Sequence, residues 1–149
     1  MRIKTIVTFL YACAACAAGW AGAQTPWLTV VGDSADTSAD TIEVDPVAIA
    51  VDGPMHTMRV RVSRPRERTS TDGIVFMSYR AVVLFDCNLR TARFLSADFF
   101  RLPLWIGSPH ESIVYASNLI RPMVFREIEP NPLQRIIRAA CQGPSGDKK

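Results

Sequence analysis

The chain has 149 residues, a hydrophobic fraction of 48% and a formal net charge of +3 at pH 7. This length allows one domain with a substantial core and is too short for two. Without Arg2 and Lys4, which lie in a segment that we expect to be removed, the 17 basic residues become 15 against 14 acidic ones, and a net charge of +1 gives no support for nucleic-acid binding.

The first 23 residues have the pattern of an export signal. "MRIK" is a short basic region, "TIVTFLYACAACAA" is an apolar stretch too short to span a bilayer, and "AGA" at 21–23 supplies the small residues of a cleavage site. We expect a signal peptide over 1–23, cleaved after Ala23. Two alternatives remain, a retained membrane anchor and lipid attachment at Cys13 or Cys16, although neither "LYAC" nor "CAAC" has the full lipoprotein pattern.

The next segments predict short strands and then one half-buried strand. "WLTVV" (27–31) is typical of a strand and "GDSADTSAD" (32–40) of a loop, and "TIEVDPVAIAVDG" predicts two strand pieces with a kink at Pro46. In "HTMRVRVSR" (56–64), Met58, Val60 and Val62 share one face, while Arg59 and Arg61 share the other. The charged stretch 65–73 predicts a loop.

Residues 74–87 give the longest strand signal, and a hairpin follows. We place Val75, Met77, Tyr79 and Cys87 on one face and Phe76 and Arg80 on the opposite face of "IVFMSYRAVVLFDC". "NLR" predicts the turn into a strand over "TARFLSADFF". After a loop over 103–112 we expect a short strand in "IVYASN" and an extended conformation in "IRPMVFREI".

The C-terminal segment predicts a short amphipathic helix. Asn131 can cap it, and Pro132 fits its first turn. The apolar positions follow helical spacing, and Gly143 can end the helix before a flexible tail over 143–149. These positions are Leu133, Ile136, Ile137, Ala140 and Cys141.

Two cysteines remain after signal cleavage, Cys87 on the apolar face of the longest strand and Cys141 on the apolar stripe of the helix. In an oxidising compartment such cysteines normally pair, so we predict a structural disulfide. A catalytic thiol would need a neighbouring base, and His56 and His110 lie in no recognisable motif. The sequence has no CxxC or HxxH spacing for zinc, and we expect no metal site and no cofactor.

The pattern around Cys87 and at the C-terminus resembles a known family. The matching positions are Tyr79, Asp86, Cys87, Arg90, Arg93, Phe94 and Leu95, followed by Phe125, Ile128, Pro130, Leu133, Ile137 and Cys141. With them the chain resembles the surface-adhesin protein E family of Gram-negative bacteria over about 27–142.

The resemblance implies an exported α+β domain over 24–142. We expect an antiparallel sheet of about five to six strands, with a C-terminal helix packed on one face and tied by the disulfide. Some members of the family are surface adhesins that bind host extracellular-matrix or serum proteins, so the resemblance implies a protein partner.

Exposed arginines are the candidate binding residues, and we name Arg59, Arg61, Arg64, Arg66, Arg68 and Arg80. The alternative interpretation is that Arg59 and Arg61 protect an edge strand from aggregation. An alternative function is that of a periplasmic accessory or inhibitor protein that binds another bacterial protein.

We expect no enzymatic activity. His110 and Glu111 in "SPHES" have no G-x-S-x-G and no metal spacing beside them, so this stretch is more typical of a polar turn. The sequence leaves the oligomeric state open, and once the signal peptide is cleaved we expect membrane attachment only through a lipid.

Overall fold

The computed structural model describes residues 26–142. The expected signal peptide over 1–23, its cleavage after Ala23, the end of the helix at Gly143 and the tail over 143–149 lie outside the described residues.

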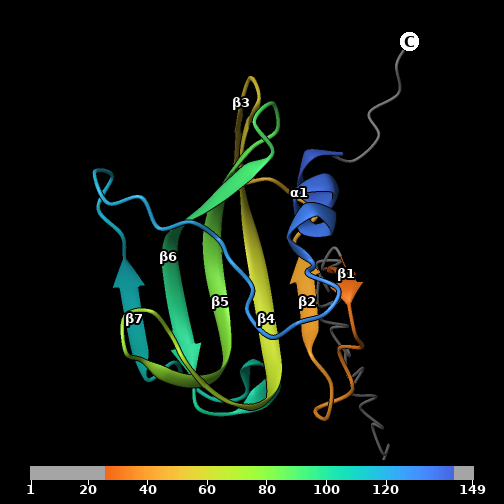
Figure 1. Ribbon diagram of the computed structural model, residues 1–149, viewed down its shortest axis with the longest axis vertical. Coiled ribbons are helices and arrows are strands. Elements are labelled where there is room, and N and C mark those ends of the chain that lie inside the picture. The colour runs from red at the N-terminus through yellow and green to blue at the C-terminus, as the bar shows by residue number, and fades with distance from the viewer. Residues whose placement is uncertain (1–25, 143–149) are drawn as a thin grey trace, which may run out of the picture.

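The strands form one antiparallel sheet in the order β1-β2-β4-β5-β6-β7, with β3 paired to β4 (Figure 1). The sheet has seven strands, against about five to six expected, and the shortest of them, at 50–52, pairs only with β4. The strands are β1 (Leu28–Val31), β2 (Thr41–Val44), β3 (Ala50–Asp52), β4 (Met55–Thr69), β5 (Val75–Asp86), β6 (Thr91–Phe100) and β7 (Glu111–Val114).

The hairpin of β4 and β5 forms the centre of the sheet, and its alternation follows the sequence. Met58, Val60 and Val62 are buried in the core, while Arg59 between them is exposed. Val62 lies opposite Tyr79, which also belongs to the core. The core therefore lies on the face of the sheet that carries these apolar residues.

The end of this hairpin differs from the expectation of a loop over 65–73. β4 continues to Thr69, and residues 64–67 lie opposite the single residue Met77, which is an irregularity in the pairing. Such irregularities twist and bend a strand locally. Phe76, which we placed on the face opposite Tyr79, instead packs edge-on against the Tyr79 ring with the ring centroids 5.5 Å apart.

The second hairpin and the strand after it are close to their predicted places. β5 and β6 are joined by the turn at 87–90, and β6 has a bulge opposite Val82 and Val83. β7 covers Glu111–Val114, two residues earlier than the start of "IVYASN". The chain then crosses the sheet from β7 towards the helix, with one isolated bridge between Pro122 and Arg93 (Figure 1).

One helix, α1 (Leu133–Cys141), ends the described chain, and it contacts β1, β2, β4 and β5. The backbone N–H of Leu133 donates to Asn131 Oδ1 at 3.0 Å, as expected for a capping residue. The buried helix residues Ile136, Ile137 and Ala140 belong to the same core as the strands. The predicted disulfide between Cys87 and Cys141 is confirmed, with the two Cα atoms 5.6 Å apart.

Candidate functional site

The fold places five of the six candidate arginines at two sites. Strand alternation puts Arg59 and Arg61 on the face opposite the core, and Arg80 of β5 lies on that face too, directly across from Arg61. We call this side of the sheet the open face. Arg64 and Arg68 line a pocket together with core residues, and Arg66 is exposed near the end of β4.

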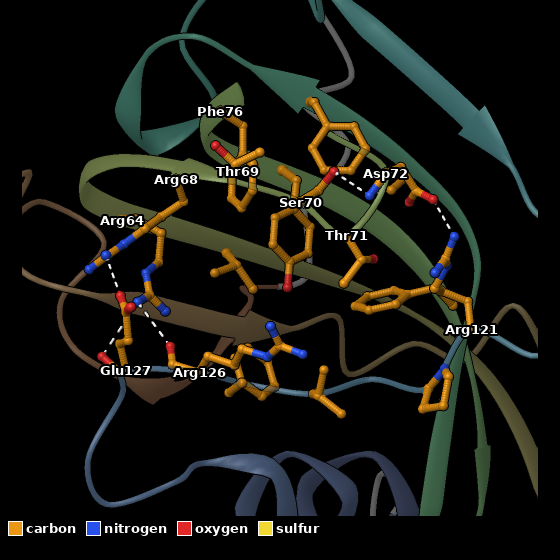
Figure 2. Close-up of a pocket in the computed structure, with 18 of the residues that line it drawn as sticks. Arg64, Arg68, Thr69, Ser70, Thr71, Asp72, Phe76, Arg121, Arg126 and Glu127 are labelled. Atoms are coloured by element: carbon orange, nitrogen blue, oxygen red, sulfur yellow. Dashed lines mark hydrogen bonds and ion pairs between the residues drawn. The ribbon is translucent and has the colours of Figure 1, made fainter. Parts of the chain in front are cut away.

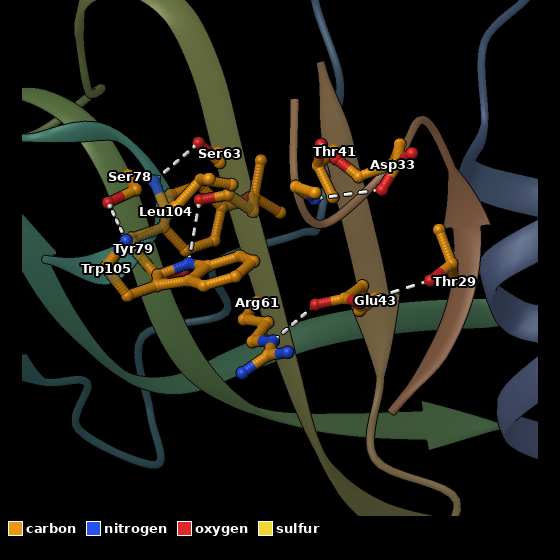
Figure 3. A network of polar contacts seen from close by, with 12 residues as sticks. Thr29, Asp33, Thr41, Glu43, Arg61, Ser63, Ser78, Tyr79, Leu104 and Trp105 are labelled. Atoms are coloured by element: carbon orange, nitrogen blue, oxygen red, sulfur yellow. Dashed lines mark hydrogen bonds and ion pairs between the residues drawn. The ribbon is translucent and has the colours of Figure 1, made fainter. Parts of the chain in front are cut away.

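Arg61 is held on the open face by one carboxylate and two indole rings. Its Nε donates to Glu43 Oε2 at 2.5 Å, and Thr29 Oγ1 donates to the other Glu43 oxygen at 3.1 Å (Figure 3). The Arg61 guanidinium carbon lies 4.3 Å from the Trp27 ring centroid and 4.2 Å from that of Trp105. Stacking of this kind stabilises a cation while leaving part of it accessible.

Trp105 belongs to a short 3-10 segment, Pro103–Trp105, which is held against the sheet by hydrogen bonds. The indole Nε1–H of Trp105 donates to two backbone carbonyls, those of Val62 and Tyr79, at 3.1 and 3.0 Å. The backbone N–H of Trp105 donates to the buried Ser78 hydroxyl, and that of Leu104 to Ser63 (Figure 3). These bonds hold Leu104 and Trp105 at φ of 51° and 60°, values that are uncommon for non-glycine residues.

A row of six polar side chains crosses the open face, one from each strand except β3. Each member lies directly opposite the next in the strand pairing, and the row is Thr29, Glu43, Arg61, Arg80, Asp98 and Ser112. At the β7 end, Ser112 Oγ donates to Asp98 at 2.7 Å. The row alternates acceptors and donors except in its middle, where two arginines meet.

The arginines of the open face are unequally neutralised. Arg61 is in a close ion pair, but Arg80 Nη2 is 4.0 Å from Asp98 and the Arg80 side chain is 50% exposed. Arg59 is 54% exposed and lies 3.4 Å from Asp45. Arg80 and Arg59 therefore keep much of their charge available to solvent.

The second place is a pocket of about 590 Å³ on the core side of the sheet (Figure 2). Its apolar lining residues come from β4, β5, β6 and the chain before α1, and they include Val62, Phe76, Tyr79, Phe94, Ala97, Phe99 and Phe125. The turn between β4 and β5 forms one wall, and the segment 121–127 forms the other.

Two ion pairs join these walls, one at each end of the pocket (Figure 2). Arg68 pairs with Glu127 at one end, and Arg121 pairs with Asp72 at the other. The Tyr115 hydroxyl also donates to Asp72, at 3.1 Å. The carboxylates of Asp72 and Glu127 are therefore engaged by groups of the protein itself.

Arg64 is almost completely buried at the end of the pocket that Arg68 also lines. Its Nε lies 2.9 Å from Asp40 Oδ1, and one of its terminal nitrogens makes long contacts of 3.4 and 3.5 Å with the carbonyls of Arg126 and Glu127. Burial lowers the pKa of Arg64, and the Asp40 carboxylate opposes that effect.

Both tyrosines of the pocket hold their protons more firmly than usual. Burial raises the pKa of Tyr79 well above its ordinary value, against the opposing effect of the Arg64 charge. Burial and the hydrogen bond to Asp72 raise the pKa of Tyr115 to about 12. At neutral pH both hydroxyls are therefore protonated and able to donate.

The residues considered for catalysis or metal binding make other contacts. His56 Nδ1 donates to the carbonyl of Ala140, at 3.0 Å, and Ser112 donates to Asp98 rather than to His110. Between residues 26 and 142, no three His, Cys, Asp or Glu side chains are placed to hold a metal ion. Within the same range, no helix has the length and apolar character to cross a bilayer.

The model of the family described as Surface-adhesin protein E matches residues 27–142. The chain belongs to this family. Membership indicates a non-enzymatic, adhesin-like protein that is exported or displayed at the surface and binds a protein partner. No curated protein and no solved structure matched the chain.

The positions that carry the resemblance to the adhesin E family build the scaffold in this chain. Cys87 and Cys141 form the disulfide, Asp86 accepts hydrogen bonds from the turn residues Asn88 and Leu89, and Ile137 is buried in the core. Family membership therefore supports the fold directly and leaves the partner to be argued from the surface.

Several residues of these sites were not singled out from the sequence. The stacking of Trp27 and Trp105 on Arg61 joins three segments that no local pattern links. The same holds for Asp72 and Arg121, which are 49 residues apart. Trp105, an isolated tryptophan in the loop expected over 103–112, was a weak signal of such a site. An aromatic residue of that kind is usually part of a core or its rim.

Proposed function

We propose that the mature protein is an exported, non-enzymatic binding domain that contacts a partner protein through the open face, with Arg59, Arg61 and Arg80 at the centre of the contact. The observation that carries this proposal is the direct pairing of Arg61 with Arg80. Like charges opposite each other destabilise an antiparallel pair. A partner that supplies carboxylates would relieve this repulsion on binding.

The partner class follows from the family and from the charge of this face. We infer a host extracellular-matrix or serum protein from the resemblance to surface adhesins, and exposed guanidinium groups favour an acidic segment of it. Arg66 is exposed and can extend the contact, whereas Arg64 and Arg68 line the pocket. The proposal therefore narrows the six candidate arginines to Arg59, Arg61, Arg66 and Arg80.

The test compares two double variants that remove the same charge. We expect R59S/R80S to weaken binding to immobilised matrix and serum proteins by tenfold or more, measured by biolayer interferometry on the mature protein. The matched control is R135S/R138S, which removes two exposed arginines of α1 and should bind like the wild type. Equal binding by both double variants would exclude the open face as the contact.

The alternative function, a periplasmic accessory or inhibitor protein, is favoured by one sequence observation. Neither Cys13 nor Cys16 has a complete lipoprotein pattern, so a lipid that would hold the protein at the outer surface is not clearly encoded. Protease treatment of intact cells distinguishes the two functions. Degradation indicates surface display, and full protection indicates a periplasmic protein with a bacterial partner.

A further inference from the structure

The pocket lies on the opposite side of the sheet from the arginines proposed to contact a protein partner. Its volume of about 590 Å³ falls within the range of roughly 300–1,000 Å³ found for small-molecule sites. Its floor is apolar and largely aromatic, and Phe76, Tyr79 and Phe99 contact one another there with ring centroids 5.4 to 6.0 Å apart. Such a floor suits the apolar body of a ligand.

One polar group of the pocket lacks a partner. Tyr79 is only 9% exposed, and its hydroxyl, which forms no hydrogen bond with another residue in the range 26–142, keeps contact with the solvent of the pocket. The hydroxyl is therefore open to the pocket and free to donate to a ligand there. Tyr79 lies opposite Val62 of β4, and Val62 is two residues before Arg64 in the sequence. The charge of Arg64 lowers the pKa of the Tyr79 phenol, against the effect of burial.

Buried donors also lie in the pocket walls, and the Nε–H of Arg64 is one that has no hydrogen-bond partner. The Nε–H groups of Arg68 and Arg121 are buried without a hydrogen-bond partner, whereas Glu127 and Asp72 are taken by the terminal nitrogens of those same arginines. Glu67 and Arg126, both exposed at the rim, carry opposite charges. These Nε–H groups are closed off from the pocket space, so a donor that a ligand can reach is the Tyr79 hydroxyl, which an acceptor oxygen complements.

We propose that this pocket binds a small amphipathic carboxylate, whose apolar body lies on the aromatic floor and whose carboxylate accepts a hydrogen bond from the Tyr79 hydroxyl beside Arg64. A carboxylate fits because it offers only acceptors and carries the charge that a partly desolvated guanidinium attracts. This site does not depend on the proposed protein contact at Arg59, Arg61 and Arg80.

The first experiment is calorimetric titration of the mature protein with decanoate, well below its micellar concentration, and with decanol. The two probes share one chain length and differ in the head group. We expect decanoate to bind at least tenfold more tightly than decanol. Absence of decanoate binding, or equal affinity for the two probes, would overturn the proposal.

The second experiment uses Tyr79→Phe, which removes the hydroxyl and keeps the ring in the core. We expect decanoate affinity to fall about tenfold and decanol affinity to stay unchanged. A Tyr79→Phe protein that is folded by circular dichroism and binds decanoate like the wild type would contradict the assigned head-group position.

The open-face variant R59S/R80S separates this site from the proposed function. It should keep wild-type decanoate affinity, while Tyr79→Phe should keep wild-type affinity for the protein partner. If R59S/R80S lost decanoate binding as well, the carboxylate site would not be independent of the open face, and its assignment to the pocket would fail.

Discussion

Arg61 of β4 and Arg80 of β5 face each other directly in the centre of the sheet, and only Arg61 has a close carboxylate partner. Glu43 and the two indole rings hold the Arg61 guanidinium on the β2 side. Arg80 is left beside Phe100, with its guanidinium carbon 4.8 Å from that ring centroid. The sheet thus accommodates two like charges by anchoring one of them.

A double-mutant cycle can measure this repulsion. With Arg61→Gln, Arg80→Gln and the double variant, we expect an unfavourable coupling of about 0.5 kcal/mol at low ionic strength. The coupling should shrink at high salt because exposed charges are screened. The measurement is urea unfolding followed by circular dichroism, and a favourable coupling would show that the two guanidinium groups attract.

Removal of the disulfide should destabilise the protein strongly. Cys87 and Cys141 are separated by 54 residues, and opening a loop of that length costs about 4 kcal/mol in the chain-entropy model. We expect C87A/C141A to lose about that much free energy of unfolding in urea. Wild-type protein treated with a reducing agent should match the double variant, and unchanged stability in both would contradict this role of the bond.

Gly32, at the end of β1, is required by a close backbone approach. It has φ of +74°, and a Cβ there would lie 2.0 Å from the carbonyl oxygen of Asp40. We therefore expect Gly32→Ala to cost about 3 kcal/mol in unfolding free energy. Gly73→Ala is the matched control because Gly73 also has positive φ, at +80°, but nothing within 4 Å, and it should cost only about 1 kcal/mol.

The pocket tyrosines make stability fall at alkaline pH. The pKa of Tyr115 is raised to about 12 and that of Tyr79 is also raised, whereas an unfolded tyrosine titrates near 10. Above pH 10 the unfolded chain loses protons that the folded protein keeps, so the free energy of unfolding decreases as the pH rises from about 10 towards 12.

Absorbance of tyrosinate against pH checks this directly. Tyr11 lies within the expected signal peptide, so the mature protein contains only Tyr79 and Tyr115 of the three tyrosines. We expect little ionisation of the folded protein at pH 10.5 and substantial ionisation of both residues in concentrated urea. Early ionisation of one tyrosine in Tyr79→Phe would show that the Tyr115 hydroxyl is not held by Asp72.

The sequence predicted those features that depend on local alternation or on a restricted choice of partners. The alternation over Met58–Ser63 placed Arg59 and Arg61 on one face because side chains in a strand alternate strictly. Cys87 and Cys141 are the two cysteines outside the expected signal peptide, so each had one expected partner in an oxidising compartment.

The pocket could not be predicted in this way, because its closure depends on distant charges. Arg68 and Glu127 are 59 residues apart, and nothing near either residue identifies the other. The extension of β4 to Thr69 was missed because Pro65 and three charged residues after Arg64 resemble a loop in composition. Pairing with β5 resumes at Arg68 and Phe76, and such tertiary pairing overrides local propensity.

The bond between Cys87 and Cys141 also determines how the protein would respond to mechanical load. A force applied between the two ends of the folded region passes from Cys87 straight to Cys141, so the intervening β6, β7 and pocket wall at 121–127 carry no tension. The oxidised chain is therefore roughly 180 Å shorter when fully extended than the reduced chain, because the 54-residue loop cannot be stretched out. In the oxidised protein, only the part from β1 to β5 can be stretched out by a pull on the termini.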